Sequence, residues 1–280
     1  MNCKSPIIIT GMHRSGTSLI VKILREKNVF IGSKLDENLE SVFFQRINKW
    51  ILSCVGSSWD NPQSISYLDV GNINLLKNRI TKVLDNRIAK TLYFGMSNIC
   101  FNKNFFKQSS NWLWKDPVNT FTLPVWMKIF PDCKVVNISR HPLDVSISLI
   151  KREERLKKID KKSEFPNIIS LILPLLSIVK GDVLSSLNLK TIDDALALYK
   201  KYYNQIEYNS NQYKNIFNIK FEDLVSNSDL VLTELFNFLD IQIKNEYLTN
   251  AEKNINKNRS LAYKNKPIKY DNTLLERINY

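Results

Sequence analysis

Residues 6–19 of this chain read PIIITGMHRSGTSL and carry its strongest signal for a fold. Four apolar, β-prone residues lead into a loop bounded by Gly11 and Gly16, and apolar residues recur at helical spacing from Thr17 onward. A strand that turns through glycines into a helix aligns backbone N–H groups with the positive end of the helix dipole. The stretch therefore predicts an anion-binding loop between a buried strand and a helix.

The loop differs from the nucleotide-triphosphate loop in its basic residue. GMHRSGTS keeps the glycine spacing of GxxxxGK[ST], but Thr17 stands where that loop has its Lys. The Lys reaches the β and γ phosphates, so its loss argues against hydrolysis of ATP or GTP. Arg14, inside the loop, offers a fixed cationic fork instead. A small-molecule kinase with an altered phosphate loop stays open as an alternative.

A second stretch, FPDCKVVNISRHPLDVSIS at residues 130–148, repeats the order of strand, turn and helix. It predicts a strand over residues 135–139, followed by a turn and a new helix. Arg140 ends the strand, and Ser148 lies eight residues later on the helix. Because Arg binds a phosphate monoester through two hydrogen bonds and a hydroxyl can complete its shell, this pair suits a second phosphate.

The two stretches, in this order, resemble the 5'-phosphosulfate loop and the 3'-phosphate motif of sulfotransferases that use 3'-phosphoadenosine 5'-phosphosulfate (PAPS). The resemblance implies PAPS as co-substrate and 3'-phosphoadenosine 5'-phosphate (PAP) as product. It also implies an α/β fold, a P-loop-like three-layer sandwich with a central, mostly parallel sheet flanked by helices. The residues that it assigns to the donor are His13, Arg14, Ser15, Gly16, Thr17, Ser18, Arg140 and Ser148.

The segment WKDP, residues 114–117, resembles the KDP segment of tyrosylprotein sulfotransferases and of many bacterial sulfotransferases. The resemblance implies that Lys115 approaches the transferring sulfuryl group, where negative charge grows. Sequence rules alone also predict Asp116 as a helix cap and Pro117 as the first helical residue. The two interpretations are compatible.

A fourth segment, IFNIKFEDL at residues 216–224, resembles the YEDL segment of the same enzymes and predicts a final strand over residues 216–221. Predicted strands thus alternate with helices, which is typical of a parallel sheet covered on both faces. Ligands bind such sheets at the carboxyl ends of the strands, where Arg14 and Arg140 both fall.

The general base is sought among the acidic residues of DENLESVFFQ, residues 36–45. The chain has only two histidines, each inside a phosphate motif, and neither matches the catalytic His of cytosolic sulfotransferases. In tyrosylprotein sulfotransferases the base is a Glu about one helix beyond the loop, and Glu40 aligns best with it. Asp36 and Glu37 are the alternatives. All three carboxylates could also simply charge the start of a helix over residues 40–52.

The expected reaction is in-line sulfuryl transfer, with Arg14 and Lys115 stabilising the leaving oxygen and Glu40 accepting the proton. No metal is expected, because the donor has no β,γ-phosphate pair to clamp. A basic loop at residues 259–269 is predicted to close over the 3'-phosphate through Arg259 and Lys264. A catalytically inactive PAPS-binding scaffold is the non-enzyme alternative.

Length and composition predict a single domain over residues 1–280, without a linker or internal repeat, and the resemblance implies that it is a sulfotransferase domain. The formal net charge of +13 suits an anionic donor and favours a carbohydrate or polysaccharide acceptor, modified on a hydroxyl or amine. Lysines are scattered, which is typical of a solvated surface and not of nucleic-acid binding. The sequence sets no oligomeric state.

Cysteine spacing and the chain start predict a cytoplasmic location. The widely separated Cys3, Cys54, Cys100 and Cys133 indicate neither a zinc site nor a disulfide framework. The chain begins without a basic-then-apolar signal segment. Residues 165–179 are strongly apolar but too short for a transmembrane span, so a buried or acceptor-facing helix is expected there.

Overall fold

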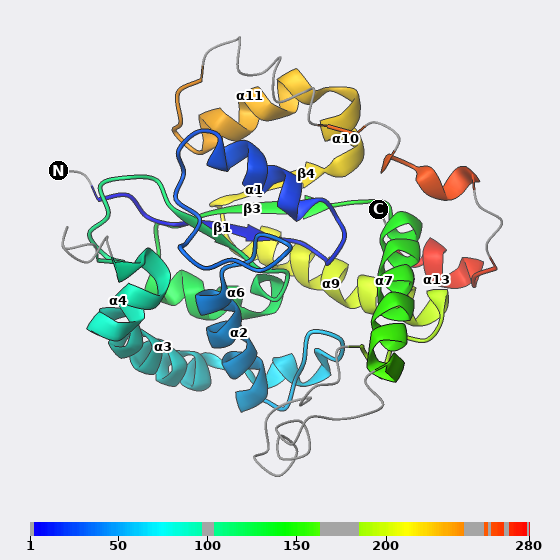
Figure 1. Cartoon of the computed structure of the whole chain (residues 1–280), viewed down its shortest axis with the longest axis horizontal. Helices are drawn as coiled ribbons and strands as arrows, with labels where there is room; N and C mark the ends of the chain where they lie inside the picture. Colours follow the sequence, from blue (N-terminus) through cyan, green and yellow to red (C-terminus); the bar gives the residue numbers. More distant parts are fainter. Residues whose placement is uncertain are drawn as a thin grey trace.

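A four-stranded parallel sheet lies at the centre of the computed structural model (Figure 1). The structure describes residues 3–96, 104–162, 185–243, 255–256, 259–265, 269–278 and 280. The strands are β1 (Ile7–Thr10), β2 (Leu113–Lys115), β3 (Lys134–Ser139) and β4 (Ile216–Lys220), in the order β2-β1-β3-β4. Every neighbouring pair is parallel, so the carboxyl ends of all four strands meet at one edge.

Helices cover both faces of this sheet (Figure 1). One face carries α1 (Thr17–Arg25), α10 (Phe221–Ser226) and α11 (Ser228–Phe238). The other carries α6 (Asn119–Ile129) and α9 (Ile192–Gln212), with α2 (Val42–Cys54), α3 (Val70–Asp85) and α4 (Arg87–Phe94) packed further out. The remaining elements are α7 (Pro142–Lys162), α13 (Asn272–Glu276) and the 3₁₀ turns η1 (Gln63–Tyr67) and η3 (Ala262–Asn265). The predicted three-layer α/β sandwich is confirmed.

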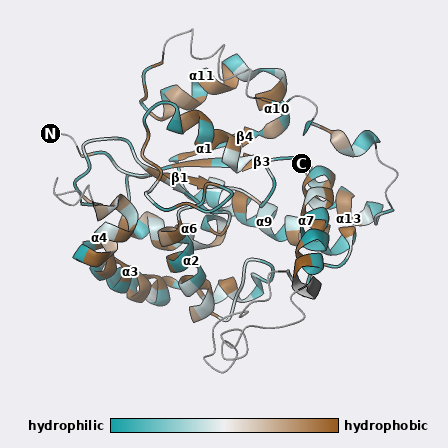
Figure 2. Cartoon of the chain, in the orientation of Figure 1, coloured by the Kyte–Doolittle hydropathy of each residue, from teal (hydrophilic) through white to brown (hydrophobic). Residues whose placement is uncertain are grey.

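The alternation of side chains along β1 explains why both faces are covered. Ile7 and Ile9 pack into the core under α1, α10 and α11, whereas Ile8 packs into the core under α2, α3 and α6. All three are buried, because a parallel sheet between two helical layers has no solvent face. Figure 2 shows the hydrophobic colour concentrated on the central strands and on the helix surfaces that face them.

One predicted helix begins later in the chain than expected, and another predicted helix falls on residues that the structure does not describe. The helix expected from residue 40 begins at Val42, because Leu35 and Ser41 pair in an antiparallel bridge that closes a turn at residues 37–39. The apolar segment 165–179 lies outside the described residues. Within the described ranges, no helix combines the length and apolarity needed to span a bilayer.

Candidate functional site

The anion-binding loop between β1 and α1 needs its two glycines for geometric reasons. Gly11 and Gly16 have φ angles of +130° and +107°. A Cβ on Gly11 would lie 2.3 Å from the carbonyl oxygen of Ile138, and one on Gly16 would lie 2.7 Å from the ring of Phe221. Since L side chains rarely adopt such φ values, packing and backbone conformation both require glycine here.

The side chains of the loop point in different directions. His13, Arg14, Gly16, Thr17 and Ser18 line a cavity of about 1420 Å³ at the carboxyl edge of the sheet. Ser15 is buried instead, and its hydroxyl donates to the carbonyl oxygen of Met12 at 2.7 Å. The side chain of Ser15 therefore stabilises the turn, while its neighbours face the cavity.

The two phosphate motifs meet in space although they are far apart in the sequence. Arg14 Nε donates to Ser148 Oγ at 2.9 Å, across a separation of 134 residues. Arg140 donates to the carbonyl oxygen of Arg14 at 3.3 Å and to Asp144 at 3.1 Å, and its guanidinium lies 5.0 Å above the ring of Phe221. Its buried Nε has no hydrogen-bond partner among the described residues. The arrangement leaves a donor available for an anion.

Lys115, at the end of β2, forms a buried ion pair with Glu40. The Nζ–Oε1 distance is 2.6 Å, and both side chains are nearly inaccessible. Lys115 also donates to the carbonyl oxygen of Asn38 at 3.1 Å and to Ser18 Oγ at 3.4 Å. Gln45 donates to the second carboxylate oxygen of Glu40 at 2.6 Å. The predicted Lys and the predicted base are thus direct neighbours in the wall of the cavity.

The other two candidate carboxylates lie differently. Asp36 accepts hydrogen bonds from the backbone N–H groups of Asn38 and Glu40, at 2.9 and 2.7 Å, and from Gln45 at 3.0 Å. Its carboxylate therefore organises the loop that carries Glu40. Glu37 is exposed. None of the three carboxylates lies in the first turn of α2, so they do not cap that helix.

Asp116 has a larger role than the cap that the sequence predicts. Its carboxylate accepts from the N–H of Val118 at 2.9 Å, as a cap does, and also from Asn48 at 2.9 Å. Pro117 is not the first helical residue, because residues 117 and 118 form a turn and α6 begins at Asn119. Burial, and then the charge of Glu40, raise the pKa of Asp116 to about 7. Raised carboxyl pKa values of this kind are frequent at functional sites, and the sequence pattern around Asp116 predicted only a helix cap.

His13 is half-buried in the lining of the cavity. Burial lowers the pKa of His13 well below its ordinary value, and the charges of Arg152, Lys115 and Arg14 lower it further. Its Nε2 has no hydrogen-bond partner among the described residues, and its ring meets Trp59 edge-on at 4.8 Å. Arg152, which sequence reasoning missed, lies 5.2 Å over the ring of Trp59 and lines the cavity. Its position four residues after Ser148 places both on one helical face, which was the available signal.

The C-terminal basic loop reaches the 3'-phosphate motif through its backbone. The carbonyl oxygen of Arg259 accepts from Arg140, and Asp144 accepts from the N–H groups of Ala262 and Tyr263 at 3.2 and 2.8 Å. Arg259 lines the cavity, whereas exposed Lys264 is not among the described residues that line it. Arg259 and Lys264 were both predicted to contact the 3'-phosphate, but of the two only Arg259 lines the cavity.

The arrangement of possible metal ligands among the described residues differs from that of a metal-binding site. In the part of the chain that the structure describes, no group of three or more His, Cys, Asp or Glu side chains is placed to hold a metal ion. The charged groups of the cavity instead form hydrogen-bonded pairs, such as that of Lys115 and Glu40.

The loop, the two arginines and the Lys–Glu pair line one cavity at the carboxyl edge of a parallel α/β sheet, and comparison with known proteins gives the family. The family model described as "Sulfotransferase family" matches residues 6–160, more than half of the chain. The chain therefore belongs to the sulfotransferase family. No curated protein matches it.

Three solved structures illustrate the shared fold. The sulfotransferase domain from the curacin biosynthetic pathway has 16% identity and a TM-score of 0.52, with 99% of this chain and 97% of that chain covered. The sulfotransferase domain of the Synechococcus PCC 7002 olefin synthase has 14% identity and a TM-score of 0.54, with coverage of 100% and 96%. Sulfotransferase STF1 from Mycobacterium tuberculosis H37Rv has 14% identity and a TM-score of 0.50, with coverage of 99% and 77%. At these identities the likeness establishes the fold.

Proposed function

We propose that this chain is an enzyme that transfers a sulfuryl group from PAPS to a hydroxyl or amine of an acceptor. One observation carries the proposal: Arg14, Arg140 and Ser148, from two separate strand-to-helix turns, come together beside the buried pair of Lys115 and Glu40. PAPS has phosphates at two positions and one reactive sulfuryl end, so it needs anion-binding groups for the phosphates and separate groups beside the sulfur. Family membership supports the same reaction.

The residues present fit the donor. The loop after β1 has no Cβ at Gly11 or Gly16, so backbone N–H groups at the start of α1 can approach the 5'-phosphosulfate closely. The unpartnered Nε of Arg140 and the hydroxyl of Ser148 suit the 3'-phosphate. PAPS, when bound, supplies the activated sulfuryl group.

In this proposal each side chain of the Lys–Glu pair has its own task. Lys115 and Arg14 stabilise negative charge on the oxygen that leaves with the 5'-phosphate, as the bond from sulfur to that oxygen breaks. Glu40 accepts the proton that the acceptor loses as its oxygen or nitrogen bonds to sulfur. Protonation of Glu40 leaves the charge of Lys115 free to serve the leaving oxygen. The reaction needs no metal ion.

The acceptor is proposed to be a carbohydrate, on the basis of charge. Besides the donor residues, Lys49, Lys151 and Arg152 line the cavity, and the chain as a whole carries +13. Such a cavity favours hydroxyl-rich acceptors that carry negative charge. We further propose that residues 1–280 act as one domain in the cytoplasm.

Calorimetric titration with PAP, with and without Mg²⁺, tests the donor half. We expect metal-independent binding that weakens by at least about tenfold in Arg140→Ala, because a charged hydrogen bond contributes about 1.5–3 kcal/mol. Arg87→Ala, on the exposed start of α4, is the matched control. A preference for ATP with Mg²⁺ would instead support the kinase alternative. PAP binding without sulfuryl transfer to any of a panel of hydroxyl and amine acceptors would support the scaffold.

A further inference from the structure

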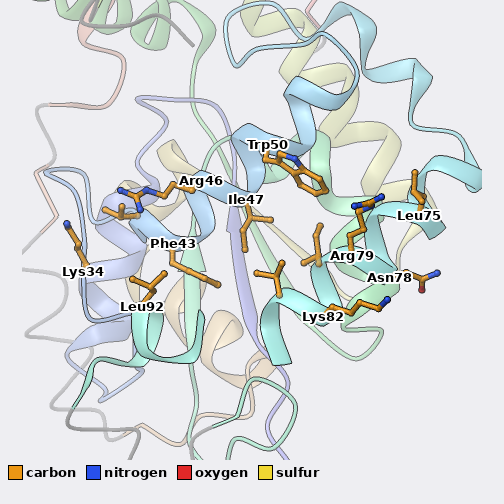
Figure 3. Close-up of a pocket in the computed structure, with 13 residues that line it drawn as sticks. Lys34, Phe43, Arg46, Ile47, Trp50, Leu75, Asn78, Arg79, Lys82 and Leu92 are labelled. Atoms are coloured by element: carbon orange, nitrogen blue, oxygen red, sulfur yellow. The ribbon is translucent and has the colours of Figure 1, made fainter. Parts of the chain in front are cut away.

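A second cavity, of about 890 Å³, lies between α2, α3 and α4 (Figure 3). Its long walls are the side chains of two helices. On α3 they recur at the spacing of one helical face, from Leu75 through Arg79 to Val83, and on α2 they run from Val42 to Trp50. Leu92 of α4 and Lys34 of the loop before α2 close one end of the cavity. We refer to this cavity as the α2–α3 groove.

The floor of the α2–α3 groove is apolar and unusually open. Of the thirteen residues that line it, eight are apolar. Phe43 and Ile80 are buried at its base, while Trp50 is 41% exposed and Leu75 is 55% exposed. Large apolar side chains gathered in one concave patch are typical of a binding site, whereas scattered single ones are not.

The charges around the groove all have one sign. Its lining includes Lys34, Arg46, Arg79 and Lys82, one amide, Asn78, and no acidic residue. None of the four cations forms an ion pair within the described part of the chain. Figure 3 shows Lys34 and Arg46 at one side of the apolar floor and Arg79 and Lys82 at the other. An occupant with an apolar body and a negative group would match both features.

We refer to the 1420 Å³ cavity, where the donor is proposed to bind, as the donor cavity. The groove and the donor cavity lie on opposite faces of α2. Gln45, Lys49 and Leu52 face the donor cavity, whereas Phe43, Ile47 and Trp50 face the groove. At 100° per residue these two sets fall on opposite sides of the helix. Only the edge residues Val42 and Arg46 line both cavities. The groove is therefore a separate site, independent of the sulfuryl-transfer proposal.

We propose that the α2–α3 groove binds an anionic amphiphile of small size, an aliphatic chain that ends in a carboxylate. The chain lies on the floor of Phe43, Ile47 and Ile80, and the carboxylate pairs with the cations of α3. A second copy of this protein is a poorer occupant. In a two-fold dimer the same patch faces itself, so the cations of one groove would face those of the other without an acidic partner in the lining.

Tryptophan quenching by 11-bromoundecanoate, below its micelle concentration, tests this site. Bromine quenches only a nearby indole, and Trp50 lies in the groove whereas Trp59 lines the donor cavity. We expect saturable quenching that is largely lost in Trp50→Phe and retained in Trp59→Phe. Undecanol, which lacks the charge, should compete at least about tenfold more weakly than undecanoate, as expected when an ion pair is absent. Quenching that is lost instead in Trp59→Phe would place the ligand in the donor cavity and overturn the proposal.

Two double variants with reversed charges distinguish binding in the groove from nonspecific attraction to the basic surface. Arg79→Glu with Lys82→Glu should weaken binding of undecanoate by at least about tenfold, since two favourable charges become unfavourable. Lys77→Glu with Arg87→Glu makes the same change in net charge outside the groove and should leave the affinity unchanged. Circular dichroism checks that each variant is folded. Equal weakening in both pairs, dimerisation through the groove, or binding to anionic vesicles without binding to monomeric undecanoate would each refute the site.

Discussion

Lys115 Nζ lies 2.6 Å from Glu40 Oε1, and the side chains of the two residues are only 3% and 6% exposed. The pair joins the end of β2 to the loop before α2, across a sequence separation of 75 residues. Removing two charges from water costs free energy. Further hydrogen bonds, from Gln45 to Glu40 and from Lys115 to the carbonyl oxygen of Asn38, offset part of that desolvation cost. A pair held this firmly can orient a base against a reacting group.

Glu40→Gln tests the base directly. We expect kcat for sulfuryl transfer to fall by about 10²–10⁴-fold, the usual contribution of general-base catalysis, with little change in the affinity for PAP. The unfolding free energy should fall by about 3 kcal/mol, because Lys115 stays buried without its counter-charge. Steady-state kinetics, calorimetry and urea unfolding measure the three quantities. Glu37→Gln tests the alternative base, which is exposed and lines the same cavity, and an equal loss of kcat in that variant would reject Glu40 as the base.

The glycines of the anion-binding loop allow a test of packing against backbone conformation. Gly11→Ala should destabilise the fold by more than about 3 kcal/mol, because the new Cβ would overlap the carbonyl oxygen of Ile138 and φ would be strained. Gly56→Ala is the comparison variant, since its φ of +67° lies in the left-handed region that other residues can adopt and no atom lies within 4 Å of the added Cβ. We expect a cost of only about 1 kcal/mol there. Equal losses in urea unfolding would show that packing at Gly11 contributes nothing.

The raised pKa of Asp116 predicts a particular dependence of stability on pH. The ordinary pKa of an aspartate is about 4, whereas the pKa of Asp116 in the folded protein is about 7. Between these values the folded protein holds a proton that the unfolded chain has lost, so the unfolding free energy falls as pH rises. In Asp116→Asn this contribution is absent.

Urea unfolding at about pH 5 and about pH 8 measures that difference. The native protein should lose on the order of 2 kcal/mol more than Asp116→Asn over this interval. His13 contributes with the opposite sign, because its depressed pKa makes the folded protein gain stability as pH rises through the ordinary histidine range. That contribution is common to both proteins and cancels in the comparison. The same pH dependence in both would contradict a raised pKa at Asp116.

Asp144 holds Arg140 and the C-terminal segment at once. Its carboxylate pairs with Arg140 and accepts the N–H groups of Ala262 and Tyr263. Asp144→Ala should therefore weaken PAP binding by roughly tenfold, as a lost charged hydrogen bond would. It should also speed proteolytic cleavage near residue 262. Asp271→Ala, in the cap of α13, is the control. Weaker binding without faster cleavage would show that Asp144 acts on Arg140 alone.

Arg259 and Lys264 are expected to differ, although both belong to one basic loop. Arg259 lines the donor cavity and contacts Arg140 through its carbonyl oxygen, whereas Lys264 is exposed elsewhere. Calorimetry with PAP should show weaker binding for Arg259→Ala, by about threefold to tenfold, as for the loss of one partly exposed charge contact. Lys264→Ala should bind as the native protein does. Unchanged affinity in both variants would remove the loop from the site.

The sequence predicted the strand-to-helix turns because their signals are local. Gly11 and Gly16 mark positive φ angles, and the apolar runs around residues 7–10 and 135–139 mark buried strands. It also placed Arg14 and Arg140 at strand ends, where parallel sheets bind ligands. The helix starts were less accurate, since the bridge between Leu35 and Ser41 delays α2 through a contact that local propensity does not encode.

The family, the layered α/β fold and the two strand-to-helix turns could thus be predicted from local sequence patterns, because their signals come from residues close together in the chain. The carboxylate that contacts Lys115 could not, because that contact depends on how distant segments pack. Asp36, Glu37 and Glu40 lie within five residues of one another, and the positive φ of Leu39, +62°, turns the chain there. The order β2-β1-β3 then brings Lys115 and Arg140 to either side of the loop after β1. The α2–α3 groove likewise exists only because residues of α2, α3 and α4, separated in the sequence, come together around it.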